Sequence, residues 1–208
     1  MDRKTNILKR FVIYMAILTF VMFTVWALVK SFINRPPGDY HTEVCDIRLK
    51  DKKYDEALEA ANTALEKTPN HRGAIMCKAL VYISEKKYFK ATEELNYLIN
   101  FLENNLVNDD KTGKGTLAAA YANRGIIKDR SKNYEDALKD YIKALGIDHV
   151  AVAGPGLGTI ILNYKFKSSS VRERALYLNK QLQLPEEERV LRIEKLDEGQ
   201  VMHKPGKL

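Results

Sequence analysis

Two glycine-containing segments are the first candidates for chemistry, because glycine-rich loops can cradle phosphate groups. Gly154-Pro155-Gly156-Leu157-Gly158 has no strand before it and lacks the G-x-G-x-x-G spacing of a dinucleotide-binding loop. Thr112-Gly113-Lys114-Gly115-Thr116 lacks the G-x-x-x-x-G-K-[ST] order of a phosphate-binding loop, since position 108 is asparagine and Gly115 follows the lysine. We interpret the first segment as a helix breaker and the second as a mobile insertion.

Metal ligands and catalytic groups are not grouped in this sequence. No histidine is spaced with a cysteine, aspartate or glutamate so that both could hold a metal from one helix face. Acidic runs such as Asp55-Glu56 and 186–188 fit helix starts or solvated faces, where negative charge is favourable. We therefore expect no enzymatic activity, no cofactor and no metal. The histidines are His41, His71, His149 and His203.

The two cysteines, Cys45 and Cys77, are far apart in the sequence and fit no zinc-binding spacing. Small apolar core residues are the favoured interpretation, because cysteine is often fully buried. A disulfide remains open if the domain faces an oxidising compartment.

The net charge of +7 is concentrated around one segment. The first 35 residues carry +5 and the rest of the chain only +2. Basic residues commonly flank a membrane span, whereas a nucleic-acid-binding domain needs a basic face of its own. We expect no nucleic-acid partner and no small-molecule substrate.

Phe11–Val29 contains nineteen residues without a charge, and a helix of that length reaches roughly 28 Å. A cleaved signal peptide would have a shorter apolar core and a small-x-small cleavage site, which Leu28–Phe32 lacks. A buried core helix would be apolar along one stripe rather than on all faces. The segment predicts a retained transmembrane helix, about 11–32, within an anchor of residues 1–35, which contacts membrane lipid.

Charge asymmetry predicts the orientation of this helix. Four basic residues precede the span and two follow it before Pro36-Pro37, which end the helix. The positive-inside rule then places the N-terminus in the cytoplasm. In a bacterium this is a single-pass inner-membrane protein with its domain in the periplasm.

Three segments of the remaining chain align with one another: 53–65, 87–99 and 133–145. The spacing from Ala57 to Ala91 is 34 residues, and that from Ala91 to Ala137 is 46. The twelve extra residues correspond to the polar stretch Leu106–Leu117, which we interpret as a loop. Apolar positions recur at three- and four-residue spacing, so these segments predict amphipathic helices. Such units bury their apolar faces only by stacking on one another.

This period and pattern resemble the tetratricopeptide repeat (TPR). An aromatic residue opens the second helix of each unit, and a small residue lies at the first helix's crossing point. The resemblance implies an all-α fold, an α-α superhelix with units 38–71, 72–105 and 118–151, within repeats spanning 36–151. The aromatic residues are Tyr54, Tyr88 and Tyr134, and the small residues are Cys45, Ala79 and Gly125.

Residues 152–187 predict a degenerate capping helix pair, about 157–167 and 171–184, with 168–170 supplying an N-cap serine. For the tail, residues 188–208, we favour an extended arm that packs on the solenoid or on a partner over a disordered segment. Its scattered apolar residues would otherwise gain nothing from burial.

The resemblance also implies a concave protein-binding surface on the first helix of each unit. The family's clamp for heat-shock chaperone C-termini is disfavoured, since of its positions only Asn123 carries the matching residue type. We expect a membrane-anchored scaffold, an accessory or assembly subunit of a multi-subunit membrane complex. The alternative is a TPR receptor or chaperone-like factor that transiently binds exported or imported clients. The predicted groove residues are Thr42, Asp46, Leu49, Met76, Leu80, Ile83, Ala122, Ile126 and Asp129.

Overall fold

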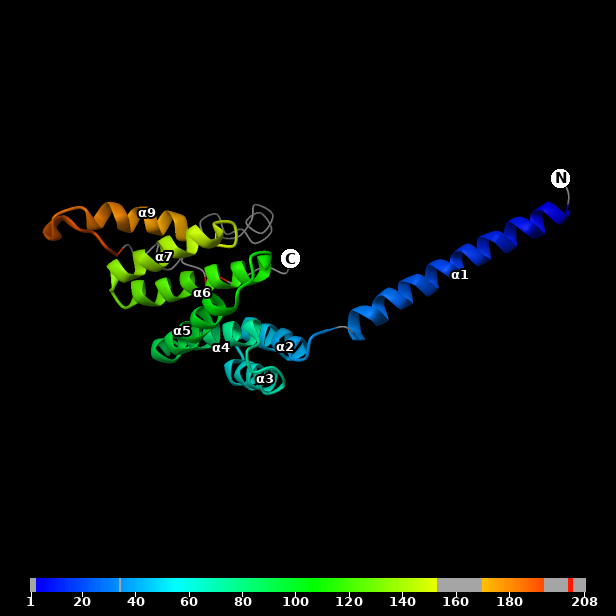
Figure 1. The fold of residues 1–208 in the computed structure, drawn as a ribbon, viewed down its shortest axis with the longest axis horizontal. Coiled ribbons are helices and arrows are strands. Elements are labelled where there is room, and N and C mark those ends of the chain that lie inside the picture. The colour runs from blue at the N-terminus through cyan, green and yellow to red at the C-terminus, as the bar shows by residue number, and fades with distance from the viewer. Residues whose placement is uncertain (1–2, 34, 153–169, 193–201, 204–208) are drawn as a thin grey trace. The chain divides into compact units, whose positions relative to one another are not determined.

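The computed structural model describes residues 3–33, 35–152, 170–192 and 202–203 (Figure 1). The chain divides into two compact units, Met1–Pro37 and Gly38–Leu208. The first unit is dominated by a single helix, and the second is a body of packed helices. No strand occurs among the residues that the structure describes, so the fold is all-α as the sequence predicts.

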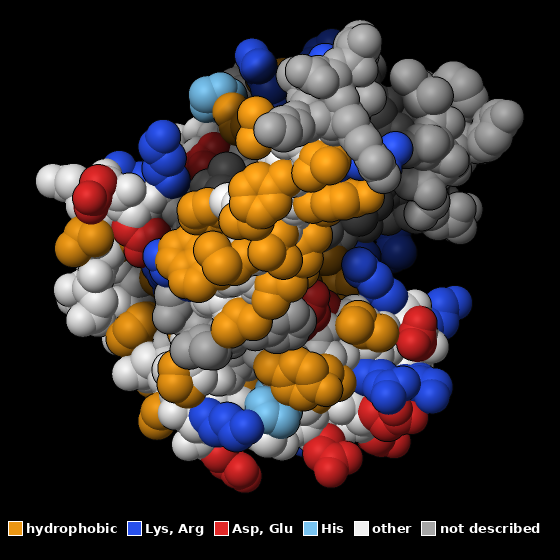
Figure 2. Space-filling view, turned by 90° about the vertical axis from the view of Figure 1, so that its right-hand side faces the viewer, with side chains coloured by type: hydrophobic (Ala, Val, Ile, Leu, Met, Phe, Trp, Pro, Cys, Tyr) orange, Lys and Arg blue, Asp and Glu red, His pale blue; other side chains and the backbone are white. Residues whose placement is uncertain are grey.

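Helix α1 spans Arg3–Ile33, and its segment Ile7–Lys30 is long and apolar enough to cross a membrane. None of that segment is buried against the rest of the protein. Its two threonines, Thr19 and Thr24, donate their hydroxyl protons to main-chain carbonyls of the preceding turn, which satisfies both groups inside the helix. Most of the large apolar side chains that are exposed in the described chain belong to α1. Figure 2 is viewed from the side on which α1 lies in Figure 1, and hydrophobic side chains gather in the middle of the view.

The second unit begins with three consecutive helix pairs (Figure 1). Within each pair the turn contains a lysine with positive φ of 60–63°, and the next residue's N–H donates to a carbonyl near the end of the first helix. These turns repeat with the spacing of the aligned segments, which confirms the repeat register. The pairs are α2 (Asp39–Lys50) with α3 (Tyr54–Lys67), α4 (Arg72–Ser84) with α5 (Tyr88–Asn105), and α6 (Lys111–Arg130) with α7 (Tyr134–Asp148); the lysines are Lys52, Lys86 and Lys132.

Small residues let the two helices of a unit approach closely, as the sequence predicts. Ala57, Ala91 and Ala137, near the starts of the second helices, are each 0% exposed. At Gly125 a Cβ atom would lie 2.7 Å from the ring of Tyr141, closer than a methyl group can be accommodated without a shift. The contact between α6 and α7 therefore depends on this glycine.

The insertion is not the loop that its composition predicted. Helix α6 already begins at Lys111, so only the first part of Leu106–Leu117 is irregular. Asp110 caps the helix by accepting a hydrogen bond from the N–H of Gly113 at 2.6 Å, and its side chain also pairs with Arg72 of α4. Glycine suits this start because a Cβ at position 113 would lie 2.3–2.6 Å from neighbouring side chains. Tertiary packing outweighs the low helix propensity of glycine here.

The last described helix, α9 (Val171–Leu182), packs on α7 and is followed by a short 3₁₀ turn, Glu186–Glu188. Ser170 and Glu173 form a capping box, so the predicted serine N-cap is confirmed. The predicted helix at about 157–167 lies outside the described residues. One continuous core runs through α4–α7 and α9, and a smaller one lies between α2, α3 and α4.

Candidate protein-binding surface

The first helices of the three units, α2, α4 and α6, supply all the predicted groove residues. These helices neighbour one another through the stack, as a TPR-like arrangement requires. Seven of the nine residues are buried within the chain: Thr42, Met76, Leu80, Ile83, Ala122, Ile126 and Asp129. Asp46 and Leu49, on α2, are half-buried. The apolar members of α4 and α6 belong to the main core, so this inner surface is continuous with the folding core.

A disulfide joins the first two units across this surface. Cys45 of α2 and Cys77 of α4 are bonded through their sulfur atoms, with Cα atoms 6.5 Å apart. Both residues are 0% exposed, so they are small core residues as predicted. The favoured interpretation did not pair them, and this part of it is wrong. The sequence separation of 32 residues hid a contact between the first helices of successive units.

The C-terminal segment contacts the inner surface at Asn123 of α6. The side-chain amide of Asn123 donates to the carbonyl oxygen of His203 at 2.7 Å, and its carbonyl oxygen accepts from the N–H of His203 at 2.8 Å. The same Nδ2 lies 3.5 Å from the sulfur of Met76. Asn123 is 0% exposed and His203 is 7% exposed, so the amide pair is closed off from water. Two hydrogen bonds in a buried setting hold the segment in a fixed register.

Burial also changes the chemistry of His203. Removal from water lowers the pKa of its imidazole from 6.5 to about 4, because the charged form loses its hydration. The ring is therefore neutral near pH 7, and docking of this residue depends on its staying uncharged.

The beginning of the arm packs on α9, as predicted. The hydroxyl of Tyr177 donates to the carbonyl of Val190, and Gln181 accepts from the N–H of Val190 at 2.8 Å. Arg174 donates to the carbonyl of Leu191 at 2.9 Å. The prediction of a packed arm is thus confirmed for the tail residues that the structure describes.

Arg174 also forms a buried ion pair with Asp129 of α6, through two hydrogen bonds of 2.7 Å. Their side chains are 3% and 4% exposed, and Tyr141 donates a further hydrogen bond to Asp129. This carboxylate, predicted as a groove residue, is therefore directed at the last helix. The pair attaches α9 to the third unit.

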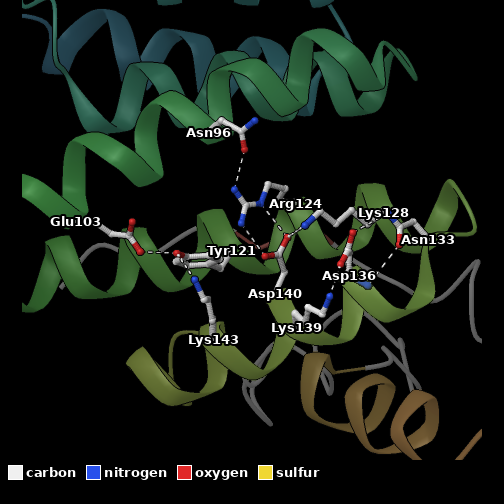
Figure 3. A network of polar contacts seen from close by, with 10 residues as sticks. All are labelled: Asn96, Glu103, Tyr121, Arg124, Lys128, Asn133, Asp136, Lys139, Asp140 and Lys143. Atoms are coloured by element: carbon white, nitrogen blue, oxygen red, sulfur yellow. Dashed lines mark hydrogen bonds and ion pairs between the residues drawn. The ribbon is translucent and has the colours of Figure 1, made fainter. Parts of the chain in front are cut away.

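A second polar network joins the outer helices of units two and three (Figure 3). Arg124 donates two hydrogen bonds of 2.7–2.8 Å to Asp140, and a third of 2.7 Å to Asn96 of α5. Lys128 pairs with the same carboxylate at 2.9 Å. The bonds to Asp140 raise the pKa of the Arg124 guanidinium, so this guanidinium stays charged. The members of the network lie on α5, α6 and α7, so it links the second unit to the third.

The histidines of the described part of the chain contribute to caps and local contacts. There, no group of three or more His, Cys, Asp and Glu residues is placed to hold a metal ion. His71 caps α4 and contacts Asp39 at 2.8 Å, whereas His41 contacts Lys67 and His149 ends α7. The glycines at 154–158 lie outside the described residues.

The contact between Asn123 and His203 was missed from the sequence. Asn123 is the single matching clamp position, and Met202 is an apolar residue of the tail. A polar residue on the inner face of a repeat and an apolar residue near the chain end are the signals that could have joined them.

Comparison with known proteins adds a structural neighbour. No protein-family model and no curated protein matches the chain. A solved structure of the first TPR domain of Spaghetti (RPAP3), bound to the HSP90 peptide SRMEEVD, is similar with 21% identity and a TM-score of 0.44. The match covers 62% of this chain and 89% of that one. The repeated turns, small crossing residues and adjacent first helices described above are the geometry of a TPR-like helix repeat in this chain.

Proposed function

We propose that this chain is a membrane-anchored protein-interaction subunit, in which α1 spans the bilayer and the helix repeat binds protein partners. The observation that carries the proposal is the combination of a helix with apolar side chains exposed on all sides and a separate, well-packed repeat body. Apolar side chains exposed over a length close to the ~30 Å hydrocarbon core are stable in lipid and costly in water. The described part of the repeat body has no cluster of metal ligands, and the first helices of its units lie against one another.

The disulfide supports placing the repeat body outside the cytoplasm. Disulfides persist in oxidising compartments such as the bacterial periplasm and are rare in the cytosol. The Cys45–Cys77 bond and the excess of basic residues before the span therefore favour the same topology. Lys30 lies 4.9 Å from the ring centroid of Trp26, a pairing suited to the membrane–water boundary at the end of the span.

Within this topology, we propose a role as an accessory or assembly subunit of a multi-subunit membrane complex. The anchor restricts the repeat body to the membrane surface, so that even a weak protein contact acts at high effective concentration. A receptor that holds exported clients transiently is the second candidate. In that role the tail contact at Asn123 is replaced by a client when one is present, which makes client binding reversible.

A mild-detergent purification of the whole chain, compared with a chain lacking residues 1–35, tests the proposal. We expect one set of membrane proteins at near-equal stoichiometry, lost when the anchor is removed. Soluble clients at low and variable stoichiometry, retained without the anchor, would instead support the receptor. Capture of no protein by either chain would contradict both roles. Alkylation of intact cells with a membrane-impermeant maleimide, after reduction, reports which side carries Cys45 and Cys77.

A further inference from the structure

Two residues near the end of the same chain, Met202 and His203, already contact the inner surface of the repeat. Asn123 and His203 are 80 residues apart in sequence, yet the carboxamide of one is paired with the main chain of the other. Asn123 is completely buried, so its donor and acceptor must both find partners in the folded state. In this structure the tail supplies both.

Asn123 pairs with the main chain of His203 and not with its side chain. The carboxamide donates to the carbonyl and accepts from the N–H of one and the same residue. It can therefore pair with any residue in an extended conformation except proline, which has no N–H. Specificity must then come from adjacent side chains. Met202 is half-buried and packs against the main core, so it provides the apolar anchor next to this amide pair. Extended peptides are commonly bound in this way, through main-chain hydrogen bonds that hold the peptide and an adjacent apolar side chain that gives specificity.

We propose that Met202–His203 is an internal ligand of the inner surface, and that a protein partner binds there by presenting an extended segment with an apolar residue in the place of Met202. The partner's segment displaces the tail and inherits the hydrogen bonds of Asn123. This inference rests on the proposed role in protein binding and adds a regulatory consequence. Because the tail is covalently attached, it competes at an effective concentration in the millimolar range. Only partners that are themselves tethered or abundant at the membrane then gain access.

The direct test is hydrogen exchange of the His203 amide in the whole chain, in detergent, with residue-level fragmentation. We expect protection at neutral pH, and a roughly fivefold to hundredfold faster exchange in Asn123→Ala, which removes two hydrogen bonds. Asn104→Ala is the matched control, because Asn104 is exposed and its side chain donates to Asn100, one turn earlier in the same helix. An amide that exchanges at the free-peptide rate in the whole chain, or equally fast in both variants, would overturn the inference.

Binding in trans gives an independent readout. The probe is a fluorescein-labelled peptide of residues 198–208, added to the whole chain and to a chain that ends at Gln200. We expect saturable binding to the shortened chain, at least about tenfold weaker binding to the whole chain, and loss of binding when the peptide carries Met202→Asp. Equal binding to both chains, or none by a shortened chain that is still helical by circular dichroism, would refute the internal-ligand role.

The two proposals can fail separately. If partners are captured but the His203 amide is unprotected, only the internal ligand is wrong. If the amide is protected but no protein is captured, the interaction role is wrong and the tail is a structural part of the fold.

Discussion

The covalent link between α2 and α4 makes the stability of the repeat body depend on its redox state. Cys45 and Cys77 close a loop of 32 residues. The chain-entropy relation for a loop of that length gives about 3.7 kcal/mol of stabilisation at 25 °C, because the unfolded chain loses freedom when it is cross-linked. For a folded unit of this size, that corresponds to a fall of roughly 7–15 °C in Tm when the link is absent.

The assay is thermal unfolding of the whole chain in detergent, followed by circular dichroism, with and without dithiothreitol. We expect the reductant to lower the Tm of the natural chain by that amount, and to leave Cys45→Ala/Cys77→Ala unchanged at a similarly low Tm. Maleimide labelling after reduction confirms that the bond was broken. A reduced, fully labelled chain that keeps its original Tm would refute the reasoning, as would thiols that react in the purified chain before any reductant is added.

Three further predictions follow from close contacts, buried charge and burial of an imidazole. Gly125→Ala should lower the free energy of unfolding by about 1–3 kcal/mol in chemical denaturation, because the new methyl group meets the ring of a tyrosine on α7. Gly146→Ala, whose methyl group meets nothing within 4 Å, should instead raise it by up to about 1 kcal/mol. Arg174→Met should cost about 3–5 kcal/mol by leaving Asp129 buried without its charge partner, and adding Asp129→Leu should recover most of that loss in the same measurement. Protonation of His203, whose pKa falls to about 4 on docking, should weaken the docked tail as pH falls below 6.5, by about tenfold in amide protection at pH 5.5 relative to pH 7.5.

Each of these has an outcome that contradicts it. Below pH 6.5 the imidazole of the undocked tail binds more protons than that of the docked tail. Docking is therefore strongest above pH 6.5 and weakest below about pH 4. His203→Phe should abolish this pH dependence, and a dependence that survives in the variant must come from another group. Equal effects of alanine at Gly125 and Gly146 would show that helix propensity, not the contact with α7, dominates. A double variant no more stable than Arg174→Met alone would show that the ion pair does not account for the loss.

The repeat architecture was predictable because its determinants are local. An aromatic residue, a small residue three positions later and a fixed period record which faces of the helices meet. The lysine turns follow the same spacing, although the positive φ of Lys52, Lys86 and Lys132 carries no sequence signal of its own, since glycine or asparagine is the usual residue there.

The insertion shows where local rules mislead. Its two glycines and its polar composition indicated a loop, yet α6 begins inside it. The reason is tertiary: Asp110 caps the helix and pairs with Arg72 on the preceding unit, and the space beside Gly113 is too small for a Cβ. The local sequence contains the capping residue, but it does not show which side chains from other elements leave room only for glycine.

The docked tail was harder to foresee for a different reason. Main-chain hydrogen bonds do not require a particular side chain on the paired residue. Almost any residue at position 203 could therefore form the same two bonds with Asn123. The sequence traces are the polar residue on the inner helix and an apolar residue near the chain end. A buried asparagine with both of its amide groups directed at one residue indicates a place prepared for a peptide group rather than for a particular side chain.

Because most residues of the inner face are buried, few of them can be substituted to test binding without also affecting stability. Met76, Ile83 and Ile126 line the inner face but are also almost completely buried core residues. Truncating any of the three would remove core volume, at a cost of roughly 2–5 kcal/mol, and a loss of binding would then report unfolding as much as recognition. Asn123 differs, because its strong hydrogen bonds go to the tail and not to the helices around it. Substitution there removes the two hydrogen bonds to the tail, but it also changes a fully buried position beside Met76, so the stability of the variant has to be measured along with its binding. A partner that binds elsewhere on the repeat would not respond to the loss of those two bonds.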